Sequence, residues 1–287
     1  MTVYAFGEVL WDVYPDRKCI GGAPFNFAAH TARLGNEVYL LSAVGEDDLG
    51  DETLAAIREQ GVKADAVTRS ALPTGRCLVS LDAEGVPSYH LLENVAYDEI
   101  SPALTVQQDG VLYFGTLALR SSHNRASLDA LLRENSFREI FVDLNIRPPF
   151  STVKAICFAV GHATVLKISE EELGAALSAL GLEACSYRDA AFALKAQYQG
   201  LRLVLITRGG DGAYLYDAQT EMEYEAPAET VRVVSTVGAG DSFSAAFLSE
   251  YLRHRDPDKA LAFAASLAAF VVSRKEAVPH YTLRDIM

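Results

Sequence analysis

The 287-residue sequence predicts an α/β protein with a doubly wound, mostly parallel sheet, helices on both faces and a small antiparallel β lid. Strand-like and helix-like segments alternate along most of the chain, which is typical of parallel sheets. Several of the expected strands are continuous apolar runs, as in sheets covered by helices on both faces. One region, 73–100, interrupts the alternation with two strands and no helix between them.

The alternating elements are expected in the following order. Glycines at 35 and 61 are typical helix ends and close the first two helices. The apolar run Ala260–Val272 is shorter than the roughly 20 residues that span a bilayer, so we expect it to be a buried helix. The other expected elements are strands over 3–9, 37–45, 111–115, 139–145, 164–169 and 201–207, and helices over 24–35, 48–61, 126–135, 169–177 and 187–199.

The interruption, Pro73–Ile100, contains two alternating strands around a turn at 82–85. Such a hairpin is either a flap over a site or a dimer surface, or a plain edge hairpin. No low-complexity linker or internal repeat divides the chain. We therefore expect residues 1–287 to form a single domain.

Composition excludes several classes of partner. The net charge of −13 argues against nucleic acid or an anionic membrane, because both require clustered cations. The cysteines show no paired or metal-binding spacing, so we expect reduced, mostly buried thiols in a cytoplasmic protein. No basic region precedes an apolar core at the N-terminus, so no signal peptide is expected. The cysteines are Cys19, Cys77, Cys157 and Cys185.

The segment STVGAGDSF places Gly238, Ala239, Gly240 and Asp241 at the start of an expected helix. The free N–H groups and the dipole of a helix N-terminus favour an anion, and glycines let a phosphate approach the backbone. Asp241 has two interpretations. It either complements the helix dipole or acts as a base beside an anion site.

Two further glycine-rich segments are candidate ligand-binding loops, and motifs of other common enzyme classes are absent. ITRGGDGAYLY is either a hairpin turn or a ligand loop, and in CIGGAPFNF the side chain of Asn26 is a core, capping or polyol-binding group. Asp12 follows the first strand, where open sheets bind ligands, but it is also placed to cap a turn.

The sequence contains no P-loop, dinucleotide fingerprint, zinc-peptidase or hydrolase motif.

Taken together, these segments resemble the ribokinase-like (PfkB) carbohydrate kinases, most closely the fructokinases. GGAPFNFAAHTARLG is similar to the family's N-terminal signature, and STVGAGDSF to its C-terminal signature. TRGGDG resembles the nucleotide loop, and LKISEEEL resembles a Lys-x-Asn-x-x-Glu segment. DLNIRPP and ENVAYDEI are similar to fructokinase segments, so the resemblance covers essentially the whole chain.

The resemblance implies an ATP- and Mg²⁺-dependent sugar kinase with a β lid at about 11–20 and 73–100, often paired into a homodimer. Asp241 would be the base, and the N–H groups of 238–241 would stabilise the transferred phosphoryl group. Arg147 would meet the substrate or that phosphoryl group, unless it is a plain surface charge. Glu172 would order the Mg²⁺, although it also fits a capping box with Ser169. The implied sugar ligands are Asp12, Gly22, Asn26, Tyr97 and Asn145, and the implied nucleotide ligands are Lys167, Thr207, Gly209, Gly212, Gly238 and Gly240.

The chain departs from the family pattern at three positions. Ser235 replaces an aspartate that commonly helps to hold a monovalent cation, and Glu276 replaces a glycine in the same cation site. A monovalent cation is therefore doubtful, unless Glu276 itself supplies the lost charge. Ser169 replaces the usual asparagine. The alternatives to a fructokinase are a related kinase for 2-keto-3-deoxygluconate, ribose or a riboside, and a non-catalytic sugar sensor.

Overall fold

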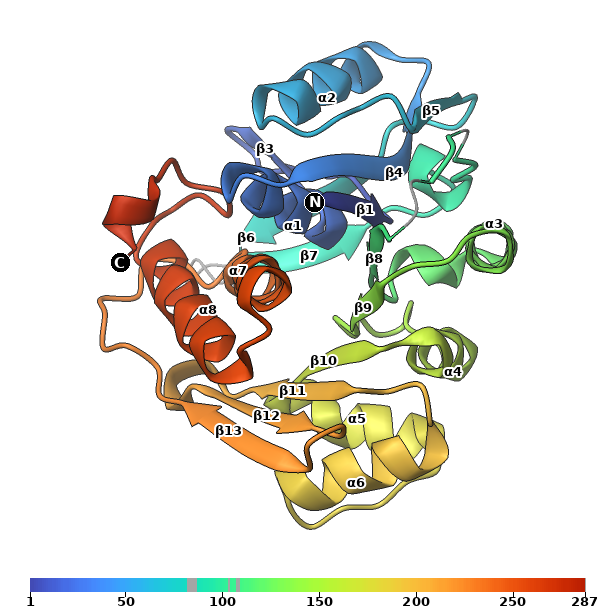
Figure 1. The fold of residues 1–287 in the computed structure, drawn as a ribbon. Helices are drawn as coiled ribbons and strands as arrows, with labels where there is room; N and C mark the ends of the chain where they lie inside the picture. Colours follow the sequence, from blue (N-terminus) through green and yellow to red (C-terminus); the bar gives the residue numbers. More distant parts are fainter. Residues whose placement is uncertain (82–86, 103, 107–108, 287) are drawn as a thin grey trace.

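A computed structural model describes residues 1–81, 87–102, 104–106 and 109–286. Its main element is a nine-stranded sheet in the order β13-β12-β11-β10-β9-β8-β1-β4-β5 (Figure 1). The strands from β5 to β11 are parallel to their neighbours, and β12 and β13 are antiparallel. They are β1 (Thr2–Phe6), β4 (Glu37–Gly45), β5 (Val67–Ser70), β8 (Val111–Phe114), β9 (Glu139–Asp143), β10 (Val165–Ser169), β11 (Leu203–Thr207), β12 (Ala213–Asp217) and β13 (Met222–Ala226).

Helices cover both faces of this sheet, and the core divides accordingly. Along β1, Val3 and Ala5 belong to one apolar cluster, and Tyr4 and Phe6 to the other. The first cluster includes side chains of α1 (Ala23–Arg33), α2 (Asp48–Glu59), α7 (Ala239–His254) and α8 (Pro257–Val272). The second includes side chains of α3 (Ser122–Glu134), α4 (Val153–His162), α5 (Glu170–Leu180) and α6 (Tyr187–Gln197). The expected doubly wound fold is confirmed.

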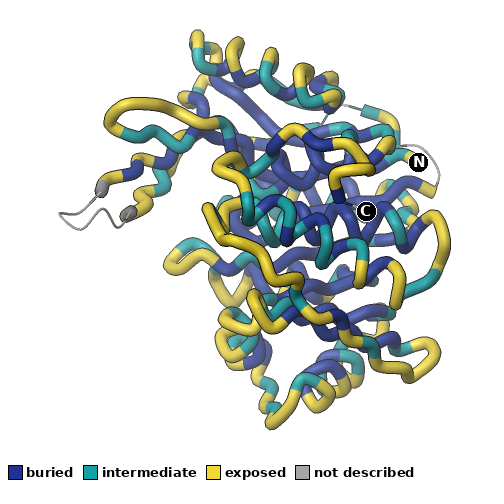
Figure 2. The backbone as a smooth tube through the Cα atoms, turned by 90° about the vertical axis from the view of Figure 1, so that its left-hand side faces the viewer, coloured by how far each residue is buried: buried dark blue, intermediate teal, exposed yellow. Residues whose placement is uncertain are grey.

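A second sheet of four strands lies apart from the first, in the order β3-β2-β6-β7. Its strands are β2 (Leu10–Val13), β3 (Lys18–Gly21), β6 (Arg76–Leu81) and β7 (Pro87–Leu91). The β6–β7 and β2–β3 pairs are antiparallel, as expected, and β2 pairs with β6 in parallel. The β6–β7 hairpin projects from the body of the molecule (Figure 2). The turn expected at 82–85 lies outside the described residues.

Some sequence expectations need correction. The strand expected over 3–9 ends at Phe6, because Gly7 has φ of 147° and the chain leaves the main sheet for β2. The helix expected over 126–135 begins earlier, because the Ser121 side chain accepts a hydrogen bond from Asn124 N and caps it. Helix α4 was not anticipated. Of the cysteines expected to be mostly buried, only Cys77 is buried, and Cys19, Cys157 and Cys185 are exposed.

The long apolar run does form the expected helix, α8, and its Leu261 and Leu267 side chains are fully buried. No helix in the described part of the chain is long and apolar enough to cross a membrane.

Candidate active site

The candidate site lies where the parallel strands of the large sheet end. The segments after β1, β8, β9, β10 and β11 all emerge at the same edge, because parallel strands share a direction. The amino-terminal end of α7 contributes the GAGD segment. Most residues that the sequence singled out lie on these segments or on α7.

The first turn of α7 presents unpaired backbone donors. Gly238 is its N-cap, with φ of 82°, and accepts a hydrogen bond from Ser242 N at 2.9 Å. The N–H groups of Gly240 and Asp241 precede this first intrahelical bond, so the helix supplies no acceptor for them. A Cβ added to Gly238 would lie 2.5 Å from Ala277 O. Only glycine therefore fits this turn, which has the open donors of an anion site.

Asp241 projects from this turn and is held by a residue from the N-terminal signature. Asn26 Nδ2, on α1, donates a 2.9 Å hydrogen bond to Asp241 Oδ2. Burial raises the pKa of Asp241 to about 6, while the Asn26 bond and the charges of Lys167 and Arg147 oppose the rise. A carboxyl group with such a pKa is ionised at neutral pH and is basic enough to accept a proton.

Lys167 lies directly behind the glycine turn. Its Nζ is 2.9 Å from the place where a Cβ on Gly240 would stand. It is also 3.0 Å from both carboxylate oxygens of Asp143, which accepts a further 2.9 Å bond from Ser244 Oγ. Burial would lower the pKa of Lys167, but Asp143 and Glu172 outweigh it and raise that pKa. The ammonium group therefore stays charged beside the turn.

Glu172 joins two segments of the site through backbone donors. Its Oε1 accepts a 2.6 Å bond from Ile146 N, and its Oε2 accepts a 3.0 Å bond from Ser169 N. Ser169 Oγ accepts from Glu172 N in return, so the capping-box alternative is confirmed for the start of α5. This carboxylate fixes the loop after β9, which carries Asn145 and Arg147.

Arg147 is exposed on this anchored loop. Its backbone N–H donates to Ser151 Oγ at 2.8 Å, and Phe150 N donates to Arg147 O at 2.8 Å. Its charge lowers the pKa of Asp241, so the guanidinium lies within electrostatic reach of that carboxylate. Asn145 precedes it with φ of 43°. The side chain of Asn145 makes no recorded hydrogen bond in the described structure.

Asp12 and Gly22 belong to the segment that links β1 to α1. Burial raises the pKa of Asp12 to about 6, and a hydrogen bond from the Cys77 thiol opposes the rise. A Cβ on Gly21 would stand 3.0 Å from Asp12 Oδ2, and one on Gly22 would stand 2.6 Å from Glu8 O. This glycine pair therefore lets the chain pass tightly over Asp12 and the end of β1.

Thr207, Gly209 and Gly212 lie farther along the same sheet edge. Thr207 ends β11 and pairs with Ser169 at the end of β10, two residues beyond Lys167. Gly209 and Gly212 have φ of 53° and 91° and flank the turn into β12. This is also a hairpin between antiparallel strands, as the turn interpretation of the sequence expected.

The sequence did not single out Glu8, which follows β1 and is only 3% exposed. Burial raises the pKa of Glu8 to about 7, and the negative charge of Asp241 adds to the rise. Its Oε2 has no hydrogen-bond partner, and the same is true of Asn26 Oδ1 and the hydroxyls of Tyr97 and Tyr113. The only signal in the sequence was a charged residue inside the apolar run expected as a strand over 3–9.

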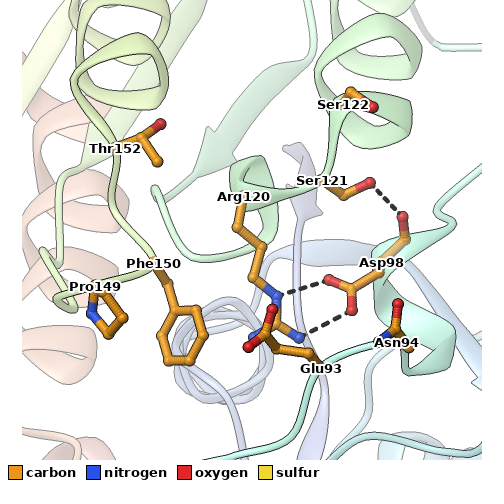
Figure 3. A pocket seen from close by; sticks show the side chains of 9 residues that line it. All are labelled: Glu93, Asn94, Asp98, Arg120, Ser121, Ser122, Pro149, Phe150 and Thr152. Carbon is orange, nitrogen blue, oxygen red and sulfur yellow. Dashed lines mark hydrogen bonds and ion pairs between the residues drawn. The ribbon is translucent and has the colours of Figure 1, made fainter.

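A cavity of about 450 Å³ is lined in part by Pro149 and Phe150, which follow Arg147 on the loop after β9 (Figure 3). Arg120 lies within it, paired with Asp98 through bonds of 2.8 and 2.9 Å, and its guanidinium carbon is 5.0 Å from the ring centres of both Tyr97 and Phe150. The starts of α3 and α4 form another wall, at Ser121 and Thr152. The cavity has an aromatic side and a polar side of mixed charge.

The expected cation positions show no assembled ligand set. Glu276 is exposed without a recorded partner, and Ser235 Oγ accepts only a 3.3 Å bond from Val237 N. Among the residues that the structure describes, no cluster of three or more histidine, cysteine, aspartate or glutamate side chains is arranged to hold a metal ion.

Comparison with known proteins identifies the family. The family model described as "pfkB family carbohydrate kinase" matches residues 7–281. This chain belongs to the pfkB family of carbohydrate kinases. A fructokinase of Rhizobium leguminosarum bv. trifolii is 29% identical over 85% of this chain and 77% of its own length.

Other relatives carry different names. A 5-dehydro-2-deoxygluconokinase of Shouchella clausii is 28% identical over 94% of this chain and 85% of its own. The crystal structure of aminoimidazole riboside kinase from Salmonella enterica, complexed with aminoimidazole riboside and an ATP analogue, gives a TM-score of 0.81. It is 26% identical and covers 97% of this chain and 95% of its own. The pfkB assignment is thus firm, and its relatives differ in substrate.

Proposed function

We propose that this pfkB-family chain is an ATP-dependent fructokinase that makes fructose 6-phosphate, with Asp241 as the base. The observation that carries the proposal is the Asp241 carboxylate, held by Asn26 at the open first turn of α7. The fructokinase relative supports the choice of sugar, and the complex of a relative with an ATP analogue supports the nucleotide.

In the proposed reaction, Asp241 takes the proton from the sugar's 6-hydroxyl as that oxygen attacks the γ-phosphorus of ATP in line. The sugar oxygen forms a new O–P bond while the P–O bond to ADP breaks, and the proton remains on Asp241. The N–H groups of Gly240 and Asp241, with Gly238 and Ala239 shaping the turn, stabilise the charge on the transferred group. Arg147 meets the same group from the loop after β9.

Lys167 acts on the nucleotide side. Because Asp143 holds its ammonium group behind Gly240, we assign it to stabilising negative charge at the turn. Thr207, Gly209 and Gly212 border the nucleotide, and Asp12, Gly22, Asn26, Tyr97 and Asn145 border the sugar.

Mg²⁺ fits this site better as an ion bound to the phosphates of ATP than as an ion held only by protein side chains. Both oxygens of Glu172 already accept backbone N–H bonds, so this carboxylate would contribute to an Mg²⁺ site mainly through water. Mg²⁺ commonly keeps several waters and binds substrate phosphates, and it neutralises their charge when bound.

The second candidate acceptor is a sugar with a further ring or an acidic group, such as a riboside or 2-keto-3-deoxygluconate. The 450 Å³ cavity that begins at Pro149 and Phe150, next to Arg147 on the same loop, favours it, because it offers room for a second ring or an acidic group. Release of ADP in the presence of each sugar distinguishes the candidates. If kcat/KM is highest for fructose, the result supports our proposal. If it is higher for a riboside or a sugar acid, that sugar is the substrate instead.

We further propose that residues 1–287 act as one cytoplasmic domain, with a β lid at about 11–20 and 73–100 that pairs two copies into a homodimer. Leu78 and Tyr89 on the hairpin are 43% and 54% exposed. They lie on opposite faces, because Leu78 is paired with His90 and Tyr89 with Val79, so each face offers one apolar side chain to a second copy. Light scattering after gel filtration should give the mass of a dimer, and Leu78→Asp should halve it. A monomeric wild-type protein would rule out this pairing.

A further inference from the structure

We propose that Glu8 is a further acceptor-binding residue, and that its free carboxylate oxygen holds a hydroxyl group of the sugar beside Asp241. The inference rests on the proposed function, because it needs a polyol in this site. It assigns a role to a residue outside the motifs that define the site.

The position of Glu8 in the sheet is the first argument. It follows β1, which lies between β8 and β4. The strand order reverses here, since later strands continue on one side of β1 and β4 and β5 lie on the other. Open α/β sheets bind ligands in the crevice outside the carboxyl ends of strands at such a reversal.

The second argument is the unsatisfied oxygen. Glu8 is only 3% exposed, and its Oε2 lacks any partner in the described structure. Its recorded partners are backbone N–H groups, its own and that of Ala23, the first residue of α1. A buried carboxylate oxygen without a partner costs free energy that a bound donor recovers.

The surroundings of this oxygen select the kind of ligand. Ala23, whose N–H donates to Glu8, and Asn26, which contacts Asp241, both lie in the first turn of α1, so the two carboxyl groups lie at the start of the same helix. Asn26 Oδ1 and the Tyr97 and Tyr113 hydroxyls also lack partners. A sugar hydroxyl both donates and accepts, and so it satisfies such a set. A phosphate is a poor fit here, because two carboxyl groups would repel it.

A purely structural role is the alternative. The bond from Ala23 N makes Glu8 a remote cap for α1, whose own N-cap, Gly22, has no side chain. Glu8→Gln separates the roles, because the amide keeps one oxygen for Ala23 N and replaces the other with an NH₂ group. A matched control is Asp256→Asn, which makes the same change at the cap of α8, where Asp256 Oδ1 accepts from Lys259 N.

The experiment measures KM for fructose and for ATP in wild type, Glu8→Gln and Asp256→Asn. At pH 8, above the pKa of about 7 that burial gives Glu8, we expect Glu8→Gln to raise the fructose KM about 10- to 100-fold, the usual effect of losing a hydrogen bond to a charged group. The ATP KM should change less than about twofold, as for a residue that touches only the sugar. The fructose analogue that lacks the hydroxyl bound by Glu8 should bind wild type and variant equally, because neither protein can make that bond. An unchanged fructose KM, or equal rises for both substrates, overturns the assignment.

Two further measurements keep the result decisive. If Glu8→Gln does not fold, Glu8→Asp replaces it, since the shortened carboxylate withdraws from the hydroxyl and should raise the same KM. Thermal-shift binding of a sugar panel separates this inference from the function. If wild type binds a sugar and Glu8→Gln binds it equally, only the role of Glu8 fails. If no sugar stabilises wild type, the proposed function and the role of Glu8 fail together.

Discussion

Asn26 Nδ2 donates a 2.9 Å hydrogen bond to Asp241 Oδ2 across 215 positions of the chain. The bond joins α1, which carries the N-terminal signature, to α7, which carries the C-terminal one. It ties the proposed base to the wall of the proposed sugar site. It also stabilises the ionised form of Asp241 against the burial that raises the pKa to about 6.

The first prediction concerns the pH dependence of the reaction. A base must be unprotonated, so kcat of the wild type at saturating fructose should fall as pH drops below about 6, the pKa of Asp241. Asn26→Leu removes the donor that opposes the rise, so the pKa should increase and the acid limb should move to higher pH. Initial rates of both proteins between pH 5 and 9 locate the acid limb of each. An acid limb that stays in place, or moves to lower pH, contradicts this role of Asn26.

The turn at Gly238 predicts a sharp contrast between two glycine substitutions. Gly238→Ala places a Cβ 2.5 Å from Ala277 O at φ of 82°, so it should distort the turn and lower kcat by more than about tenfold. Gly174→Ala, in an exposed part of α5 with no atom within 4 Å, should stabilise the protein by about 0.5–1 kcal/mol. Turnover and thermal unfolding check both variants. Full activity in Gly238→Ala would refute the tight turn.

The Asp143–Lys167 pair predicts a large loss of stability when one partner is removed. Lys167→Met leaves the Asp143 carboxylate buried without its cation, which should cost about 3–5 kcal/mol. Lys259→Met, which breaks an exposed pair with Asp256, should cost less than about 1 kcal/mol. Urea unfolding compares them. Similar losses in the two variants would mean that the buried pair does not depend on its complementary charges.

The altered cation positions predict weak or absent activation by potassium. Ser235 lacks the charge that usually helps to hold the ion, and the exposed Glu276 has no recorded contact that would supply it. Turnover should therefore be similar in potassium and in choline buffers of equal ionic strength. Strong potassium activation would show that other groups hold the ion.

Much of the fold was accessible from the sequence because local patterns encode it. Alternating apolar strands and helices predicted the doubly wound sheet, and Gly238–Asp241 predicted the open start of α7. Contacts between distant segments were not accessible. No local pattern pairs Asn26 with Asp241 or Asp143 with Lys167, and Glu8 resembles any acidic residue after a strand until its free oxygen is seen. The exposed cysteines were wrongly expected to be buried, because a single residue does not reveal which face of an element it occupies.

The most direct test of the account is ADP release with fructose and ATP, in wild type and Asp241→Asn. The amide is isosteric and can still accept a hydrogen bond from Asn26, but it cannot accept the proton. We predict turnover by wild type and a loss of about a hundredfold or more in Asp241→Asn, with unchanged sugar binding. Comparable turnover in the two proteins would contradict the role of Asp241 as the base. A wild-type protein that binds sugar but turns over none of the panel would instead be a sensor.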